Sequence, residues 1–314
     1  MNGALVDIEK VLEKRAAMIE KEIGLLSFVI EPPELAEVVR YALEQKGKKI
    51  RAALLTISCE AVGGSFTQAL VPAVIMEMIH NTSLILDDVI DKADTRRGRS
   101  TINKRWGNNM ALIACDALLA LAIRQTSRSN ARLTGAIIEC AATSMLNLAE
   151  GEALELVRKD YTIDDYYRIA DCKTASLFRA SAEVGALVGG GTDREVRAMR
   201  IYGNCIGTAF QIKDDILDVT SSNDTLGKPT LIDLKMDRPT IIMLLAQEGG
   251  ITREEMLRMS REELREALVP SVACAEMMAV RKIEEAKRQL KNLREGPSRD
   301  RLEALGDYVL ARSK

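Results

Sequence analysis

The stretch from 83 to 97 reads Ser-Leu-Ile-Leu-Asp-Asp-Val-Ile-Asp-Lys-Ala-Asp-Thr-Arg-Arg, and it ends an apolar helical pattern in a group of carboxylates. On an α-helix Asp87 and Asp91 stand on one face a single turn apart, with Asp88 beside them. Carboxylates held that close repel one another unless a cation joins them. Ionised oxygens on a rigid helix, with coordination positions left for water or phosphate, suit Mg²⁺ better than a soft metal. The stretch therefore predicts a magnesium site.

The same pattern recurs at 211–219, Gln-Ile-Lys-Asp-Asp-Ile-Leu-Asp-Val, which sets Asp214, Asp215 and Asp218 at the end of another apolar helix. One acidic cluster on a helix is more often a solvated face. Two copies, each embedded among Leu, Ile and Val, should instead border the interior. The repeat therefore favours a metal-diphosphate site over two coincidental solvated turns.

The architecture expected from the whole chain is an all-α bundle, because long helical patterns are punctuated by Gly or Pro and alternating strands are lacking. With 314 residues one domain, 1–314, is expected. From about Gly47 to Arg312 the chain resembles the trans-prenyltransferases, the polyprenyl (isoprenyl) diphosphate synthases of the farnesyl and geranylgeranyl diphosphate synthase kind. The resemblance implies an isoprenoid synthase bundle with a central catalytic cavity, about three Mg²⁺ ions bound with diphosphate, and a homodimer.

Cations at a predicted helix start form the next candidate site. Lys48 and Arg51 follow Gly47, and basic groups at a helix N-terminus oppose the macrodipole unless an anion binds there. A solvated cationic turn is the alternative, and spacing alone does not separate the two. In the resembling family a Gly-Lys-x-x-Arg signature at this place holds the diphosphate of isopentenyl diphosphate.

Further cations and the only histidine flank the first acidic motif. His80 lies two turns before Asp87 on the same helix face, where a lone histidine is usually a satisfied core residue. Arg96 and Arg97 are forked donors suited to phosphate oxygens. The resemblance assigns His80 and Arg97 to isopentenyl diphosphate and Arg96 to the allylic diphosphate. The segment 92–109 has little periodicity and is expected to be a loop that closes over a ligand.

The second half of the chain adds polar candidates. Lys173 and Thr174 open a predicted helix and would on their own be a plain helix start. The resemblance places this pair, with Gln211, against the carbocation region and the allylic diphosphate. The segment 220–236 has no regular period and resembles the family's flexible lid, in which Lys228 reaches the allylic diphosphate.

Departures from the family pattern fall beside these candidates. Leu231 stands where a glycine is customary, and Arg238 stands where the family has lysine. Arginine keeps the charge, but its planar fork is not a point charge. Leu86 replaces the histidine that often precedes the first motif, and the sequence offers no physical account of its consequence.

The reaction that suits this constellation is loss of diphosphate from an allylic substrate. If the two acidic helix ends face each other, Mg²⁺ and an incoming diphosphate neutralise the wall of carboxylates jointly. The metals with Arg96, Lys173 and Lys228 then stabilise the departing charge, and the double bond of isopentenyl diphosphate attacks the allylic cation. In the family the released diphosphate is thought to take the final proton. The chain has no Ser-His-Asp order and no Gly-rich phosphate loop.

The residues just before the first motif are expected to set the length of the prenyl chain in the product. Ser83 and Thr82 should line the wall on which the growing tail descends, because side chains lean toward the helix N-terminus. Both are small, so the pocket should admit a tail longer than farnesyl, with Met78 or Met76 as its floor. A residue of a neighbouring helix is the other candidate for the floor. The small wall favours a C20 geranylgeranyl product, and longer polyprenyl chains are the rival.

Other readings are a class I terpene cyclase and a non-catalytic partner subunit. Cyclases usually carry an Asn/Ser/Glu-type second metal motif, and inactive relatives tend to lose an acidic motif. Here both Asp motifs are intact, and Lys48, Arg51 and Arg97 remain for a second diphosphate. A synthase acting on isopentenyl diphosphate and dimethylallyl, geranyl or farnesyl diphosphate is therefore favoured.

Composition bounds the partners and the compartment. A net charge of −2 and a pI near 5.8 provide no basic field for nucleic acid. The six cysteines form no C-x-x-C pair and suggest buried thiols in a reducing compartment. The N-terminus lacks the pattern of a signal peptide, and no apolar run approaches the roughly 20 residues of a membrane span. A cytoplasmic protein without stable membrane insertion is expected.

Overall fold

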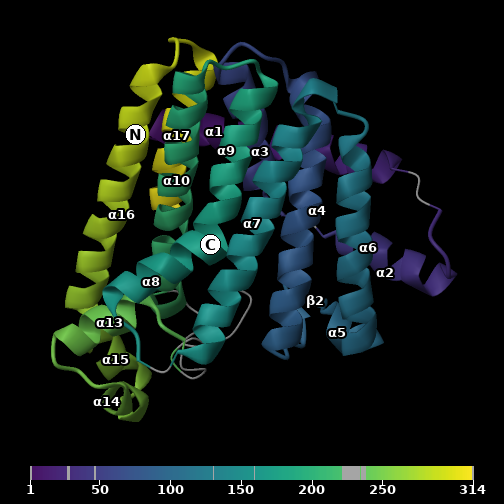
Figure 1. Ribbon diagram of the computed structural model, residues 1–314. Helices are drawn as coiled ribbons and strands as arrows, with labels where there is room; N and C mark the ends of the chain where they lie inside the picture. Colours follow the sequence, from purple (N-terminus) through teal and green to yellow (C-terminus); the bar gives the residue numbers. More distant parts are fainter. Residues whose placement is uncertain are drawn as a thin grey trace.

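Helices make up almost all of the part of the chain that the computed structural model describes, which is residues 2–26, 29–45, 47–129, 131–158, 160–220, 234 and 238–312 (Figure 1). The elements, labelled as in Figure 1, are α1 (Asn2–Leu25), α2 (Pro33–Leu43), α3 (Ile50–Ala61), α4 (Phe66–Ile90), β1 (Thr95–Arg96), β2 (Arg99–Ser100), α5 (Ile102–Trp106), α6 (Asn108–Thr126), α7 (Ala131–Val157), α8 (Ile163–Ala170), the π-helix η1 (Asp171–Ala175), α9 (Ser176–Val188), α10 (Asp193–Thr220), α13 (Ile241–Glu248), α14 (Arg253–Arg258), α15 (Arg261–Ala267), α16 (Val269–Gln289), the 3₁₀ helix η2 (Leu290–Asn292) and α17 (Pro297–Ala311). The prediction of an all-α bundle is confirmed, and the prediction of one domain stays a prediction.

The long helices pack side by side across the bundle. α16 contacts α10, α10 contacts α9, α9 contacts α3, α3 contacts α4, and α4 contacts α6, an order that can be followed across Figure 1. Their shared interior holds fully buried side chains such as Tyr202, Phe178 and Met78. This packing holds α4 and α10, the two helices that carry the acidic motifs, in one rigid frame.

Glycines on α10 explain why this helix lies so close to α9 and to the preceding turn η1. A Cβ added at Gly203 would stand 2.6 Å from the Phe178 carbonyl oxygen. A Cβ added at Gly207 would stand 2.5 Å from Cα of Ala175. Backbone atoms cannot move aside cheaply, so both positions require glycine.

The region after the first motif is more regular than expected. The predicted loop at 92–109 contains the antiparallel pair β1 and β2 and the short helix α5. Its two-residue turn consists of Arg97 and Gly98, both with positive φ, which is the backbone that a tight hairpin needs. Periodicity could not reveal it, because each strand has only two residues.

The start of α9 also differs from the prediction. Lys173 and Thr174 do not begin that helix but lie in the π-helical turn η1, which joins α8 to α9. Such single π turns occur often at functional sites. Thr162 caps α8, and its side chain accepts a hydrogen bond from the Asp165 amide.

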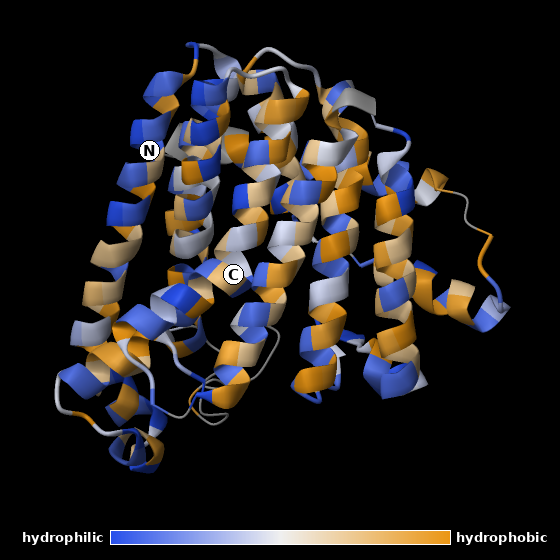
Figure 2. Cartoon of the chain, in the orientation of Figure 1, coloured by the Kyte–Doolittle hydropathy of each residue, from blue (hydrophilic) through white to orange (hydrophobic). Residues whose placement is uncertain are grey.

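Two helices correct the prediction about apolar length. α4 has 25 residues and α6 has 19, and both are long and apolar enough for a membrane span by length and composition alone (Figure 2). In the most apolar 18-residue stretch of each helix, 67% of the residues of α4 and 44% of those of α6 are buried inside the molecule. A helix that is apolar all round occurs in the core of a protein as well as in a membrane.

The same chemical change should have opposite effects at two glycines. Gly203→Ala should lower the free energy of unfolding by about 1–3 kcal/mol, because the new methyl group overpacks the contact between α9 and α10. Gly135→Ala in α7, where nothing lies within 4 Å of the new Cβ, should raise it by about 0.5–1 kcal/mol. Urea denaturation measures both. Equal shifts at the two positions would contradict the close approach.

Candidate active site

Both acidic motifs lie at the same end of the bundle. Asp87 and Asp88 occupy the last turn of α4, and Asp91 caps that helix. The second triplet, from Asp214 to Asp218, occupies the last turns of α10. The elements that follow these helices, α5 and α13, both lie at the lower end of the molecule in Figure 1. The two motifs are therefore not directed to opposite sides.

A short segment joins the two motifs. The Arg238 guanidinium forms an ion pair with the Asp91 carboxylate. Three residues later, the backbone N–H of Ile241 donates to Oδ2 of Asp215 at 3.0 Å. Because three residues of chain span at most about 11 Å, the motifs lie on either side of this segment.

The middle aspartate of each motif is buried and held by protein donors. Asp88 is 3% exposed and accepts a hydrogen bond from Nε of Arg96 at 2.7 Å. Burial raises the pKa of Asp88, and the guanidinium opposes that shift. Asp215 is also 3% exposed, and Gln211 Nε2 donates to its Oδ1 at 2.9 Å while Ile241 donates to its other oxygen. These two carboxylates hold neighbouring side chains and backbone in place.

An arginine just after the last described helix, α17, contacts the second acidic motif. Arg312 follows α17 directly and forms an ion pair with Asp214, whose side chain is 47% exposed. The same guanidinium lies 3.6 Å from the centroid of the Phe210 ring. No local pattern in the sequence could have revealed this contact, because the two residues lie 98 positions apart.

Two glutamates that the sequence analysis missed hold Lys173. Its ammonium forms ion pairs with Glu152, at 2.8 Å, and with Glu155. Nε of Arg238 also lies 3.4 Å from the Glu155 carboxylate. Burial lowers the pKa of Lys173, but the two carboxylates raise it further than burial lowers it. Burial raises the pKa of Glu152 to about 7; Lys173 opposes this shift and the charge of Asp87 adds to it. The first motif, α7 and η1 thus share one charge network.

A glycine allows this close approach. A Cβ at Gly151 would stand 2.6 Å from Cγ of Lys173, so the Gly-Glu-x-x-Glu run at 151–155 on α7 was the available signal. In the same turn, Thr174 Oγ1 donates to Gln211 Oε1 at 2.5 Å. The structure therefore brings together Thr174 and Gln211, as the resemblance implied.

The predicted cation cluster assembles between α3, α4 and the hairpin. Nη1 of Arg51 lies 3.3 Å from Nε2 of His80, and its guanidinium lies 4.5 Å from the Phe178 ring centroid. Arg97 lies directly against Gly47, where a Cβ would be 3.2 Å from the guanidinium carbon. Burial and the nearby arginines lower the pKa of His80 well below its usual range, so the ring is neutral at pH 7.

Polar atoms in this cluster still lack hydrogen-bond partners. Nε of Arg51 and Nδ1 of His80 are buried, and neither has a partner within the described residues. Lys48 adds its ammonium 5.1 Å from the Tyr308 ring centroid. Buried donors beside several positive charges are the features of a site that accepts an anion.

The predicted wall residues lie on the inner side of α4. Thr82 is buried, and its hydroxyl donates to the Met78 carbonyl at 3.0 Å. Ser83 is half-buried and donates to the His80 carbonyl at 2.9 Å. Met78 and Met76 are fully buried. Because the hydroxyls are satisfied within their own helix, they demand no polar partner from a tail beside them.

Some predicted positions fall elsewhere. Lys228 and Leu231 lie outside the described residues, as does the rest of the predicted lid at 220–236 apart from Thr220 and Leu234. Leu86 is 37% exposed, so the side chain before the first motif faces partly outward. Arg238, which stands where the family has lysine, contacts Asp91 and Glu155 and therefore lies within the site.

The donors suit Mg²⁺ shared with a substrate. The side chains at the helix ends are carboxylates, the oxygen ligands that this hard cation prefers. Within the described ranges no three acidic, histidine or cysteine side chains gather closely enough to hold an ion by themselves. Mg²⁺ commonly takes one or two carboxylates together with phosphate oxygens and water. The carboxylates therefore fit a metal ion that arrives with a diphosphate.

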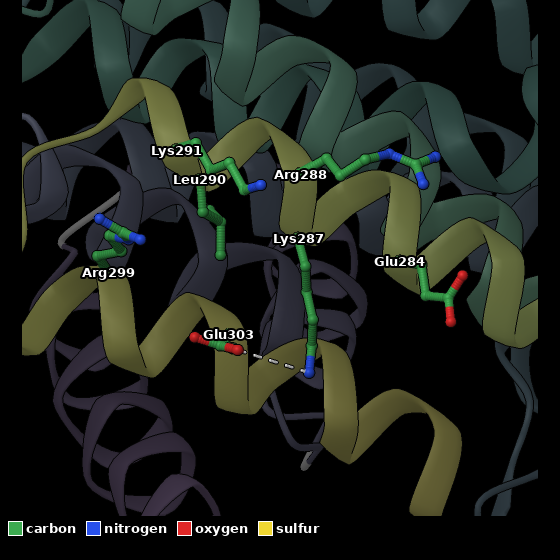
Figure 3. A pocket seen from close by; sticks show the side chains of 7 residues that line it. All are labelled: Glu284, Lys287, Arg288, Leu290, Lys291, Arg299 and Glu303. Carbon is green, nitrogen blue, oxygen red and sulfur yellow. Dashed lines mark ion pairs between the residues drawn. The ribbon is translucent and has the colours of Figure 1, made fainter.

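A basic surface pocket of about 320 Å³ lies at the other end of the bundle. Figure 3 shows its lining side chains, which come from α16, η2 and α17, with Lys287 extending from α16 toward Glu303 on α17. Its cations include Lys287, which lies 3.9 Å from Glu303 and 2.7 Å from Asp307. Internal ion pairs already occupy this lysine, and the pocket contains none of the candidate site residues.

The fold and the site together define a class of enzyme. Two acidic helix ends meet across one segment, and a separate cation cluster lies on the α3 side. This arrangement has places for a metal-bound diphosphate and for a second anion, as a transferase of diphosphate-activated groups requires.

Comparison with known proteins agrees with this class. The family described as polyprenyl synthetase matches residues 32–276. The chain is 31% identical to a geranylgeranyl diphosphate synthase of Methanosarcina mazei, over 98% of this chain and 99% of that protein. It is 32% identical, over the same shares, to a short chain isoprenyl diphosphate synthase of Methanothermobacter thermautotrophicus. A crystal structure of geranylgeranyl pyrophosphate synthetase from Pyrococcus horikoshii, 30% identical, matches with a TM-score of 0.89 over 98% of both chains.

The chain belongs to the polyprenyl synthetase family. It is a prenyl-transferring enzyme with the all-α isoprenoid synthase fold, so the predictions of family, fold and enzyme class are confirmed. Enzymes of this family generally depend on Mg²⁺ and use isopentenyl and allylic diphosphates.

The raised pKa of Glu152 has a measurable consequence for stability. The folded state binds a proton that the unfolded chain has lost, so the Glu152 contribution to stability should fall as pH rises from about 4.5 to about 7. The unfolding free energy of wild type should therefore fall relative to that of Glu152→Gln over this window, and the difference between them should stay constant above it. Urea denaturation at a series of pH values measures it. A difference independent of pH would contradict the shift.

Proposed function

We propose that the protein condenses isopentenyl diphosphate head to tail with dimethylallyl, geranyl or farnesyl diphosphate and releases diphosphate. The observation that carries the proposal is the meeting of both acidic motifs at the segment from Arg238 to Ile241, beside a second, cationic site. One site suits a metal-bound leaving group, and the other suits a diphosphate that remains on its substrate.

In this proposal the first and last aspartates of the first motif and the first aspartate of the second motif form the allylic site, together with the metal ions that they bind. Asp87, Asp91 and Asp214 would hold Mg²⁺, which supplies charge neutralisation for the diphosphate when bound. Asp88 and Asp215 orient Arg96 and Gln211. Asp218, the last of the second triplet, completes the predicted ligand set. About three ions, bound with the diphosphate, are proposed because the family resemblance implies them.

The chemistry follows from how the basic residues are divided. Lys173 and Arg238 stabilise negative charge as the allylic C–O bond breaks, and Lys228 is proposed to join them. Lys48, Arg51 and Arg97 hold the second diphosphate while its double bond supplies the electron pair of the new C–C bond. Neutral His80 contributes a hydrogen bond and not a base. The released diphosphate is proposed to accept the proton that leaves.

We propose a C20 geranylgeranyl product. The small side chains Thr82 and Ser83 and the buried Met78 support it, as do relatives named geranylgeranyl diphosphate synthase. A longer polyprenyl product is the alternative. Incubation with Mg²⁺, an allylic diphosphate and labelled isopentenyl diphosphate separates three candidates. A synthase forms an elongated product only when both substrates are present, and a cyclase forms a hydrocarbon from the allylic substrate alone. A non-catalytic partner subunit forms neither product.

We also propose a cytoplasmic homodimer. Six free thiols suit a reducing compartment. Large apolar side chains are exposed on the adjoining helices α6 and α7, where an interface is expected. They are Leu112, Ile113, Ile123, Ile138 and Leu146.

Removing one outer carboxylate should abolish most of the activity. Asp87→Ala should reduce kcat/KM for the condensation by roughly 100-fold or more, because the leaving diphosphate loses its metal-mediated stabilisation. Asp300→Ala, which removes an exposed aspartate of α17 far from both acidic motifs and from the proposed interface, is the matched control and should behave as wild type. Elongation by Asp87→Ala at the parent rate would refute the assignment.

An aromatic ring on the wall should shorten the product. Thr82→Phe should shift products from C20 toward C15, because the ring occupies the space beside α4 that the tail needs. Thr67→Phe, an exposed position at the start of α4, should leave the products unchanged. Chromatography of the dephosphorylated products measures both. Unchanged chain length in Thr82→Phe would remove Thr82 from the wall.

A further inference from the structure

Left-handed backbone is concentrated beside the cation cluster. Among the described residues other than glycine, positive φ occurs at Lys49 (φ 47°), Lys92 (φ 52°) and Arg97 (φ 52°). All are cations that flank the acidic motif of α4 or the turn before α3. Residues with a Cβ adopt this conformation at a cost in free energy, and such residues persist only where their surroundings hold them.

Lys49 is held by a buried ion pair. Its ammonium donates to the Gln45 carbonyl at 3.0 Å and lies 3.3 Å from Oε2 of Glu77. The two side chains are 3% and 2% exposed. Lys49 is also the residue that caps α3, so its conformation sets how the chain enters that helix. Lys48 precedes it and Arg51 follows in the first turn.

Glu77 is an unexpected residue on an apolar core helix. It lies on α4, and its Oε1 is buried without a hydrogen-bond partner within the described residues. Burial lowers the pKa values of Arg51, to about 10, and of Arg97, and the charge of Glu77 counteracts part of that lowering. A buried carboxylate is costly unless it is compensated, so its surroundings of cations account for its retention.

We propose that Glu77 is a positioning residue of the isopentenyl diphosphate site. Its charge holds the ammonium of Lys49, and this contact keeps the turn at 47–49 in its left-handed conformation. That turn presents Lys48 and Arg51 to the second diphosphate. The inference rests on the proposed function and deepens it, because Glu77 would act through Lys49 and not by touching substrate.

The test compares pairs of variants. Glu77→Gln should raise KM for isopentenyl diphosphate, and its Kd measured by calorimetry without Mg²⁺, about tenfold. The KM of the allylic substrate and kcat should stay within about twofold. Two double variants, Lys49→Met with Glu77→Gln and Lys49→Gly with Glu77→Gln, leave no lone buried charge and should therefore fold. Only the glycine version should recover tight binding, because glycine adopts positive φ freely.

Glu60→Gln is the matched control. It breaks ion pairs with Arg15 and Arg301 at the other end of α3 and should change stability without changing either KM. If Glu77→Gln lowers the melting temperature but leaves the Kd unchanged, or if both double variants bind alike, the positioning role is overturned while the proposed function stands. If the wild-type protein neither binds nor elongates isopentenyl diphosphate, both fail.

Discussion

The constraint on which the site depends is charge compensation at the carboxyl ends of two helices. The aspartates of both motifs stand where the helix macrodipole is already negative, so each cluster is unfavourable without cations. Guanidinium groups from three separate elements compensate this negative charge. Arg96 meets Asp88 from the hairpin, Arg238 meets Asp91 from the segment before α13, and Arg312 meets Asp214 from the end of α17. The ends of distant elements are thereby drawn to one place.

The same requirement explains the features around the motifs. The π-helical turn η1 brings Lys173 to the glutamates of α7, and Gly151 provides the room for it. Left-handed residues and buried charges are costly for the fold, yet they collect here. Close packing of α3, α9 and α10 stabilises the frame that holds them. The left-handed residues other than glycine in the described ranges therefore lie in the turn before α3 or directly after the acidic motif of α4.

Sequence patterns predicted the regular parts of this architecture well. The long helices follow from local periodicity, which depends only on near neighbours along the chain, and both acidic motifs are short runs that the sequence shows directly. The hairpin at Arg97 and Gly98 was missed because its strands are too short to show alternation. Lys173 was placed at a helix start, because a π turn has the composition of the helices on either side of it.

The sequence by itself determined which residues can carry the chemistry: two Asp-Asp-x-x-Asp helix ends, a cationic turn at Lys48 and Arg51, and small residues before the first motif. Only the tertiary structure decided how they are partnered. The buried pairing of Lys49 with Glu77, the hold of Glu152 and Glu155 on Lys173, and the contact of Arg312 with Asp214 all join separate helices. The physical reason is that helix periodicity is a local property, whereas burial and charge pairing depend on which helix faces come together after packing.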